Sequence, residues 1–373
     1  MKVFVKTLLI VVVFIGSLYG LIEIKGETLS GKKIHKIVFI ETAADWKSCS
    51  LDNARVNNNS VVLFSSDKPS GLTTNVIAPG FPFDQLILSW NADHPDSSGA
   101  MEFSVNVSED LSHWHKFAYQ VWGERDDVKA DGEKNISSIG KMLTDYLILD
   151  RPMKFAKITL RYFSKQGDAD INLRRLSLSF ACENSSWQDY KTYHPEKASP
   201  VYGKVKLAVP YFSQRNLPRE ISGSCCSPTS GSMVLNFYGK NISTEDYAYK
   251  VYDKRAEIFG NWPHNAAAAY NCGMGKTWID SHCSFDEIYD EVAGGKPVVI
   301  SVVYGFDELP RSPIHEAPDG HLIVVVGFDG PNTVICNDPA GNNVDNGIIN
   351  YPRQELEKIW VEHGGIAYHI WPE

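Results

Sequence analysis

Runs in which apolar and polar residues alternate recur through the first half of the chain. They lie at 36–40, 84–90, 101–107, 156–162 and 173–180. Alternation with a period of two buries one face of a sheet, so each run predicts a strand. Turn-rich stretches such as 91–99 and 165–168 separate the runs. Many short strands with turns between them favour a β-sandwich over residues 30–182.

The pattern changes after a polar, proline-bearing stretch at 183–203, which we interpret as a linker. Beyond it, residues 230–238 and 285–292 predict helices, and the apolar runs 297–304, 321–327 and 333–336 predict strands. Strands that are apolar on both faces are typical of a sheet covered on both sides. The sequence therefore predicts a multidomain α+β protein, with a mixed α+β domain at 204–373.

The first 22 residues have the pattern of an export segment. Lys2 and Lys6 precede an apolar run of 15 residues, from Leu8 to Ile22. A signal peptide needs an apolar core of about 7–15 residues and a membrane-spanning helix about 20. We predict a signal peptide or an N-terminal membrane anchor at 1–22, and an extracellular or cell-surface location. The sequence leaves both forms open because 17–20 is a poor cleavage site.

Composition narrows the class of protein. The chain has 373 residues, 43% of them hydrophobic and 22% charged, which excludes a fully disordered chain. This length favours two domains. A net charge of −9 argues against a nucleic-acid partner, because binding to phosphates needs clustered Lys and Arg.

Candidate chemistry gathers in the second half. The sequence Ser224-Cys225-Cys226-Ser227-Pro228 leads into the predicted helix at 230–238, which places one thiol at its positive end and favours the thiolate. A nucleophile also needs a base and a group that orients the base. His321 begins one predicted strand and Asp338 follows the next, so we expect them side by side at one sheet edge. Gln214, 12 residues before Cys226, offers an amide donor for an oxyanion.

These residues lie within motifs that resemble the C39-like family of papain-fold cysteine peptidases. The resemblance runs from about residue 206 to 373 and rests on motifs at 209–214, 226–235, 260–265, 295–301, 320–328, 337–340, 351–360 and 364–368. It implies Cys226 as nucleophile, His321 as general base and acid, Asp338 as orienting group and Gln214 as oxyanion donor. A polar insertion at 215–224 separates Gln214 from Cys226. The first half resembles the β-rich domain that precedes the peptidase in some secreted relatives.

The leading hypothesis is an exported cysteine peptidase that hydrolyses peptide bonds through an acyl-enzyme. The partner is then a peptide or protein, and no cofactor or metal is expected. Two alternatives stay open: a cell-surface binding protein with a vestigial peptidase fold, and a thiol acyltransferase. Trp262 either lines the substrate cleft or packs inside the protein.

Two further sets of residues carry open predictions. The chain has seven cysteines, an odd number, so at least one cannot form a disulfide within the chain. We expect the free one to be Cys226, with Cys49–Cys182 and Cys272–Cys283 as candidate disulfides among the other six. Cys225 and Cys336 are expected to be structural. Three tryptophans, Trp90, Trp114 and Trp122, either form a surface that binds a cell-surface polymer or pack in the core.

Overall fold

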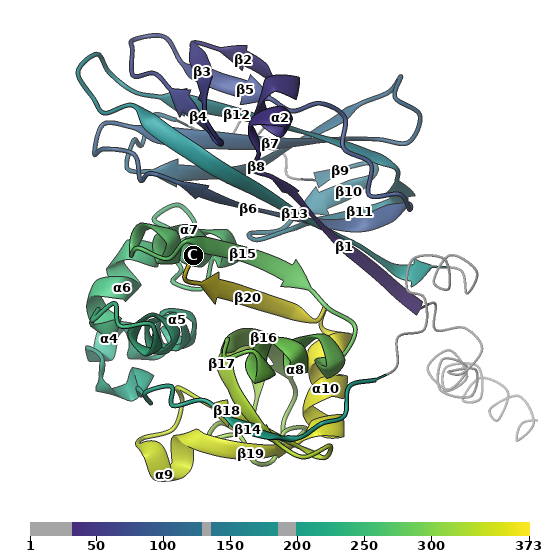
Figure 1. Cartoon of the computed structure of the whole chain (residues 1–373), viewed down its shortest axis with the longest axis vertical. Helices are drawn as coiled ribbons and strands as arrows, with labels where there is room; N and C mark the ends of the chain where they lie inside the picture. Colours follow the sequence, from purple (N-terminus) through teal and green to yellow (C-terminus); the bar gives the residue numbers. More distant parts are fainter. Residues whose placement is uncertain (1–31, 129–135, 186–198) are drawn as a thin grey trace, which may run out of the picture.

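The computed structural model describes residues 32–128, 136–185 and 199–373. In this described part of the chain the strands form three antiparallel sheets, two in the N-terminal half and one in the C-terminal half (Figure 1). The protein is therefore a β-rich, multidomain chain. The predicted export segment at 1–22 and most of the predicted linker, 186–198, lie outside the described residues.

The two N-terminal sheets share one hydrophobic core. The larger has the order β3-β4-β13-β6-β11-β10-β9, with β1 also paired to β13, and the smaller has the order β2-β5-β12-β7-β8. Trp90 of β6 stacks on Phe103 of β7 with ring centroids 4.0 Å apart, which joins the sheets. The elements are β1 (Lys32–Ile40), α2 (Ala43–Ser48), β2 (Ser50–Asp52), β3 (Ala54–Asn57), β4 (Ser60–Leu63), β5 (Ser70–Thr73), β6 (Phe83–Ala92), β7 (Ala100–Ser108), β8 (His115–Gly123), β9 (Ile136–Ser137), β10 (Gly140–Met142), β11 (Leu147–Met153), β12 (Phe155–Phe163) and β13 (Ile171–Ser185).

The third sheet has helices on both faces, as its apolar strands predict. Its order is β15-β20-β16-β17-β18-β19, with β14 also paired to β17. Successive residues of β17 alternate between two cores: Leu322 and Val324 join one, Ile323 and Val325 the other. The elements are β14 (Lys204–Lys206), η1 (Gln214–Asn216), α4 (Arg219–Ser222), α5 (Cys226–Phe237), α6 (Thr244–Val251), α7 (Trp262–Asn271), β15 (Lys276–Ser281), α8 (Phe285–Ala293), β16 (Val298–Tyr304), β17 (Ala317–Asp329), β18 (Thr333–Asn337), α9 (Val344–Gly347), β19 (Ile348–Pro352), α10 (Arg353–Glu362) and β20 (Ile366–Trp371).

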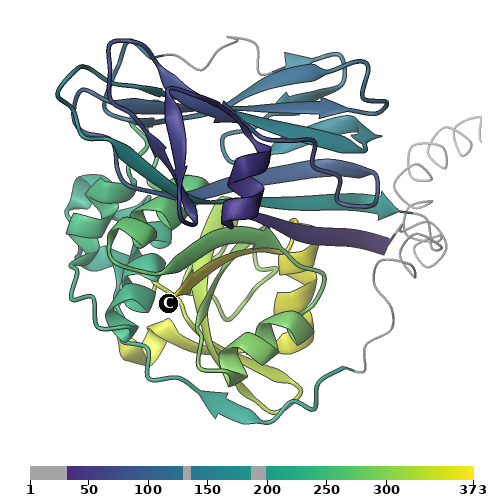
Figure 2. The ribbon, with the colours of Figure 1, turned by 45° about the horizontal axis from the view of Figure 1, so that its top comes forward.

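Buried polar contacts join the two halves where β1, β6 and β13 lie against α7 and β15 (Figures 1 and 2). The Asn91 amide donates to the Thr277 carbonyl at 2.8 Å, and the Ser179 hydroxyl donates to Asp280 at 2.6 Å. Polar groups are rarely buried without a hydrogen-bond partner, and here each half supplies the partners of the other.

One expectation from the sequence is wrong in this structure, and one open alternative is decided. All seven cysteines are free thiols, so neither Cys49–Cys182 nor Cys272–Cys283 forms and the count does not single out Cys226. Trp90 has no exposed surface and Trp122 only 3%, which confirms the core-packing alternative for these two residues; the three tryptophans therefore do not form one surface. Cys225 and Cys336 are buried, in line with a structural role. Within the described ranges, no helix is both long and apolar enough to cross a membrane.

Gly231 sets how closely α5 and α6 approach. A Cβ atom on Gly231 would lie 2.6 Å from the ring of Tyr247, which is fully buried and donates its hydroxyl to the Asn265 carbonyl. We expect Gly231→Ala to lower the free energy of unfolding by about 1–3 kcal/mol, because the overlap outweighs the better helix propensity of alanine. Chemical denaturation measures this change.

The matched control is Gly223→Ala. Gly223 has right-handed helical backbone angles, and a Cβ there meets no atom within 4 Å. This variant should unfold within about 0.5 kcal/mol of the wild type. Equal stabilities of the two variants would contradict the close-packing explanation.

Candidate active site

Cys226 is the first residue of α5. The N-cap residue is Cys225, and its side chain makes no hydrogen bond to the helix. The N–H groups of the first turn are therefore not capped by a side chain, and they lie beside the Cys226 thiol. The Cys226 side chain is half-buried, whereas that of Cys225 is fully buried. The helix therefore exposes one thiol of the pair at its positive end.

His321 lies next to this thiol and is held by Asp338. The His321 Nε2 atom lies 2.7 Å from Asp338 Oδ1, and both side chains are buried. Because Nε2 pairs with the carboxylate, Nδ1 is left for the hydrogen bond between His321 and the Cys226 thiol. The structure thus brings together Cys226, His321 and Asp338.

The antiparallel pairing of β17 and β18 creates this arrangement. Asp338 follows the last residue of β18, as expected, but His321 lies inside β17, which begins four residues earlier at Ala317. The prediction that His321 begins its strand is therefore wrong. The strand extends further because Ala317 pairs with Tyr304 beyond a bulge.

Three other groups donate to Asp338, and the sequence analysis did not find them. The Ala340 N–H donates to Oδ1 at 3.0 Å, while the Tyr351 and Ser312 hydroxyls donate to Oδ2 at 2.9 and 3.5 Å. Four donors, counting His321, stabilise the buried carboxylate as an anion. Tyr351 begins the motif at 351–360 and lies on β19, whereas Ser312 precedes β17, so the sequence pattern places neither residue beside Asp338.

The charges of these groups are coupled. Burial raises the pKa of the Cys226 thiol, but the hydrogen bond and charge of His321 outweigh burial and leave that pKa below its ordinary value. Burial lowers the pKa of His321, while Asp338 and Cys226 together raise it to about 10. The pKa of Asp338 is lowered, because His321 and the other donors outweigh the effect of burial. These directions favour a thiolate–imidazolium pair. In contrast, burial raises the pKa of Cys225 to about 12.

Gln214 lies near Asp338 through its backbone, while its side chain points to the insertion. Its N–H donates to the Pro339 carbonyl at 2.9 Å, and its side-chain Nε2 donates to the Ser222 carbonyl at 2.8 Å. Gln214 Oε1 is buried and has no hydrogen-bond partner among the described residues. The amide is thus held by the segment that separates it from Cys226, and its role as oxyanion donor stays a prediction.

Trp262 packs against the N-terminal half. Its ring stacks on Tyr146 with centroids 5.4 Å apart, and its backbone N–H donates to Asp145 Oδ1 at 2.9 Å. Trp262 and Cys226 both border the same apolar cluster. These contacts support the alternative in which Trp262 packs inside the protein, and a substrate-binding role for Trp262 stays a prediction.

The family assignment comes from the sequence of this half. Residues 206–368 match the model of the Peptidase_C39 like family. This segment is similar to C39-like peptidases. It contains all the predicted site residues, and the match to this family supports a peptidase function in general. No curated protein matches the chain.

Three solved structures each match part of the chain at low identity. A C39-like peptidase from Bacillus anthracis is 19% identical, covers 46% of this chain and 98% of its own, and has a TM-score of 0.35. A double glycine motif protease from an AMS/PCAT transporter, solved with its leader peptide, is 22% identical (48% of this chain, all of its own, TM-score 0.30). A family 29 carbohydrate-binding module with cellulohexaose is 16% identical (42% of this chain, 96% of its own, TM-score 0.21).

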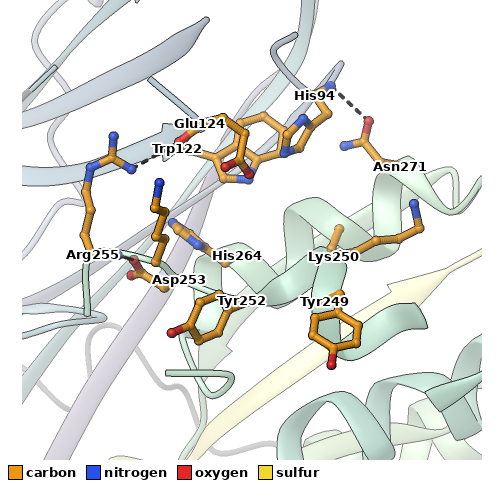
Figure 3. Close-up of a pocket in the computed structure, with 13 residues that line it drawn as sticks. His94, Trp122, Glu124, Tyr249, Lys250, Tyr252, Asp253, Arg255, His264 and Asn271 are labelled. Carbon is orange, nitrogen blue, oxygen red and sulfur yellow. Dashed lines mark hydrogen bonds between the residues drawn. The ribbon is translucent and has the colours of Figure 1, made fainter. Parts of the chain in front are cut away.

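A cavity of about 220 Å³ lies between the N-terminal half and the C-terminal half (Figure 3). It is lined by the aromatic side chains Trp122, Tyr249 and Tyr252 and by polar groups that include His264 and Arg255. Arg255 donates to the carbonyls of Val121, Gly123 and Arg125 and so fixes one wall of the cavity. None of the predicted site residues is among its lining residues.

Proposed function

We propose that the chain is an exported cysteine peptidase with a Cys226-His321-Asp338 triad. The observation that carries this proposal is the contact of His321 with both the Cys226 thiol and the Asp338 carboxylate, at the N-terminus of α5. In fold terms we propose a β-sandwich followed by a papain-like α+β domain. Export rests on the sequence of residues 1–22 alone.

Acylation begins with the Cys226 thiolate. Its sulfur attacks the carbonyl carbon of a peptide bond, forming a C–S bond and a tetrahedral oxyanion. Backbone N–H groups of the first turn of α5, with Gln214 as the predicted side-chain donor, stabilise that oxyanion. The imidazolium of His321 then gives its proton to the leaving amine as the C–N bond breaks, which leaves a thioester on Cys226.

Deacylation uses the same groups in reverse. Neutral His321 takes a proton from water, the hydroxide oxygen bonds to the thioester carbon, and the C–S bond breaks to release the acid and the thiolate. Asp338 holds the ring so that Nδ1 faces the reaction and stabilises the imidazolium each time it forms. An amine in place of water would give acyl transfer.

A direct test uses the whole chain and a peptide library with blocked N-termini. We expect new N-termini to appear by mass spectrometry and to be lost after treatment with iodoacetamide, which should alkylate Cys226 faster than the other six thiols because its pKa is lowered. Performing the reaction in H₂¹⁸O with added glycine amide distinguishes ¹⁸O-labelled acids from amide adducts. Products without ¹⁸O would favour an acyltransferase, and no products with an unreactive thiol would favour a binding protein.

A cell-surface polymer as partner of the N-terminal half also stays a proposal, as does membrane anchoring through residues 1–22. Trp90 does not contribute to polymer binding, because it is fully buried. The cavity in Figure 3 offers aromatic faces next to polar groups, a combination suited to the apolar faces and hydroxyls of a sugar.

A further inference from the structure

Three histidines and two glutamates form a hydrogen-bonded chain between the two halves of the protein. His35 of β1 pairs with Glu287 of α8, and the other Glu287 oxygen lies 2.7 Å from His282 Nδ1. His282 Nε2 lies 3.0 Å from His369 Nε2, and His369 Nδ1 lies 2.9 Å from Glu291 of α8. None of these residues belongs to the triad.

The central contact has an unusual donor count. Carboxylates accept hydrogen bonds, so Glu287 and Glu291 each fix a hydrogen on the Nδ1 atom that they contact. A neutral imidazole carries one N–H, so the Nε2 atoms of both His282 and His369 then present lone pairs to each other. Two lone pairs 3.0 Å apart repel unless a cation lies between them.

The arrangement matches a pair of metal-binding imidazoles. Two Zn–N bonds of about 2.0–2.1 Å at a tetrahedral angle place the nitrogens about 3.3 Å apart, close to the observed separation. Histidines that bind metals commonly donate their other N–H to a carboxylate, which fixes the tautomer and the ring. Glu287 and Glu291 occupy that position here.

A third ligand of the right chemistry lies beside them. Asp280, His282 and His369 each offer one ligand atom, and these atoms lie within 4.8 Å of one another. All three side chains are at least nine-tenths buried. Ser179 of β13 and the Ser281 N–H both donate to Asp280 Oδ1, which leaves Oδ2 for a ligand.

We propose that His282, His369 and Asp280 bind a divalent transition-metal ion, with Zn²⁺ the best match to two imidazoles and a carboxylate. A water molecule completes the tetrahedron. The ion joins β15 to β20, and its hydrogen-bonded neighbours come from α8 and from β13 of the N-terminal half. Its role is structural, because it stabilises the junction that orients the halves. The inference does not depend on the peptidase function.

The test uses the full chain with Cys226→Ala, so that the thiol of the triad cannot bind metal. After chelation and dialysis, titration with ZnCl₂ should give one tightly bound ion per chain and a higher unfolding temperature. Co²⁺ in its place should give the visible absorption of a tetrahedral site. Failure of the metal-free protein to bind one Zn²⁺ would overturn the proposal, and a proton between the two imidazoles would then explain the contact.

Variants locate the ion. His369→Gln and Asp280→Asn should each weaken Zn²⁺ binding by about 100-fold or more, and Glu291→Gln by about 10–100-fold. The matched control is His315→Gln, since His315 also pairs with a carboxylate, Asp307 at 3.2 Å, but is exposed. Circular dichroism verifies folding of each variant. Undiminished binding by a folded His369→Gln protein would place the ion elsewhere and overturn the assignment.

Discussion

Replacing Cys226 by alanine is expected to lower kcat/KM for peptide hydrolysis by roughly 10⁴-fold or more. The reason is specific to this position, because the variant keeps α5 and the His321–Asp338 pair but removes the atom that forms the acyl-enzyme. The Cys226 side chain is half-buried, so loss of one sulfur should leave the fold intact. Measurement of kcat/KM on a peptide found by the library experiment, with thermal unfolding in parallel, tests both statements.

Cys225→Ala is the matched control. It removes the neighbouring thiol, which is fully buried and whose pKa burial raises to about 12. Its side chain packs with Ile221, Ala248 and Phe259, so the variant should lose some stability but hydrolyse peptides at nearly the wild-type rate. Activity that survives in Cys226→Ala but is lost in Cys225→Ala would mean that the wrong thiol has been assigned.

The strands of the N-terminal half were predictable because their burial follows their sequence. β12 alternates strictly between half-buried and buried residues, as the pattern of 156–162 requires. Helix α7 was not predicted. Its alanines, Ala266 to Ala269, are buried between β6 on one side and β15 and β20 on the other, so it has no polar face to create a helical period. Its burial depends on the two halves meeting, which no local pattern records.

The same distinction applies to the sites. Cys226, His321 and Asp338 each lie in a recognisable motif at an element end or in a strand, so their proximity could be expected. Tyr351 lies 13 residues after Asp338 and Ser312 lies 26 before it, and only the pairing of β18 with β19 and the course of the chain before β17 bring them together. His282 and His369 are separated by 87 residues and become neighbours through the pairing of β15 with β20.

Asp338→Asn is expected to lower kcat/KM by about 10²–10⁴-fold and to change its pH dependence. The asparagine fits the site, because its oxygen accepts from His321 and Ala340 while the Tyr351 and Ser312 hydroxyls turn to accept from its amide. What is lost is the negative charge that raises the pKa of His321 to about 10. That pKa should fall toward the ordinary value of about 6.5, and the pKa of Cys226 should rise because its cationic neighbour is lost.

The sign of the pH effect follows from the order of these two pKa values. In the wild type the pKa of Cys226 is lowered and that of His321 is raised, so the reactive ion pair exists in the interval between them. Activity should therefore rise with pH as the thiolate forms and fall as His321 loses its proton near pH 10. In Asp338→Asn the order reverses, and neutral thiol beside neutral imidazole becomes the main form.

Tyr351→Phe makes a smaller change at the same carboxylate than Asp338→Asn. It removes the buried Tyr351 hydroxyl that donates a hydrogen bond to Asp338 Oδ2, but it keeps the charge of the carboxylate. We expect a loss of about ten-fold or less in kcat/KM and no downward shift of the alkaline limb, because the carboxylate charge that raises the pKa of His321 remains and one hydrogen bond is worth about 1 kcal/mol. Kinetics and thiol alkylation across pH should give matching acid limbs for each variant. A wild-type pH profile in Asp338→Asn would contradict the orienting role of Asp338, since a merely structural carboxylate would change stability without moving either limb.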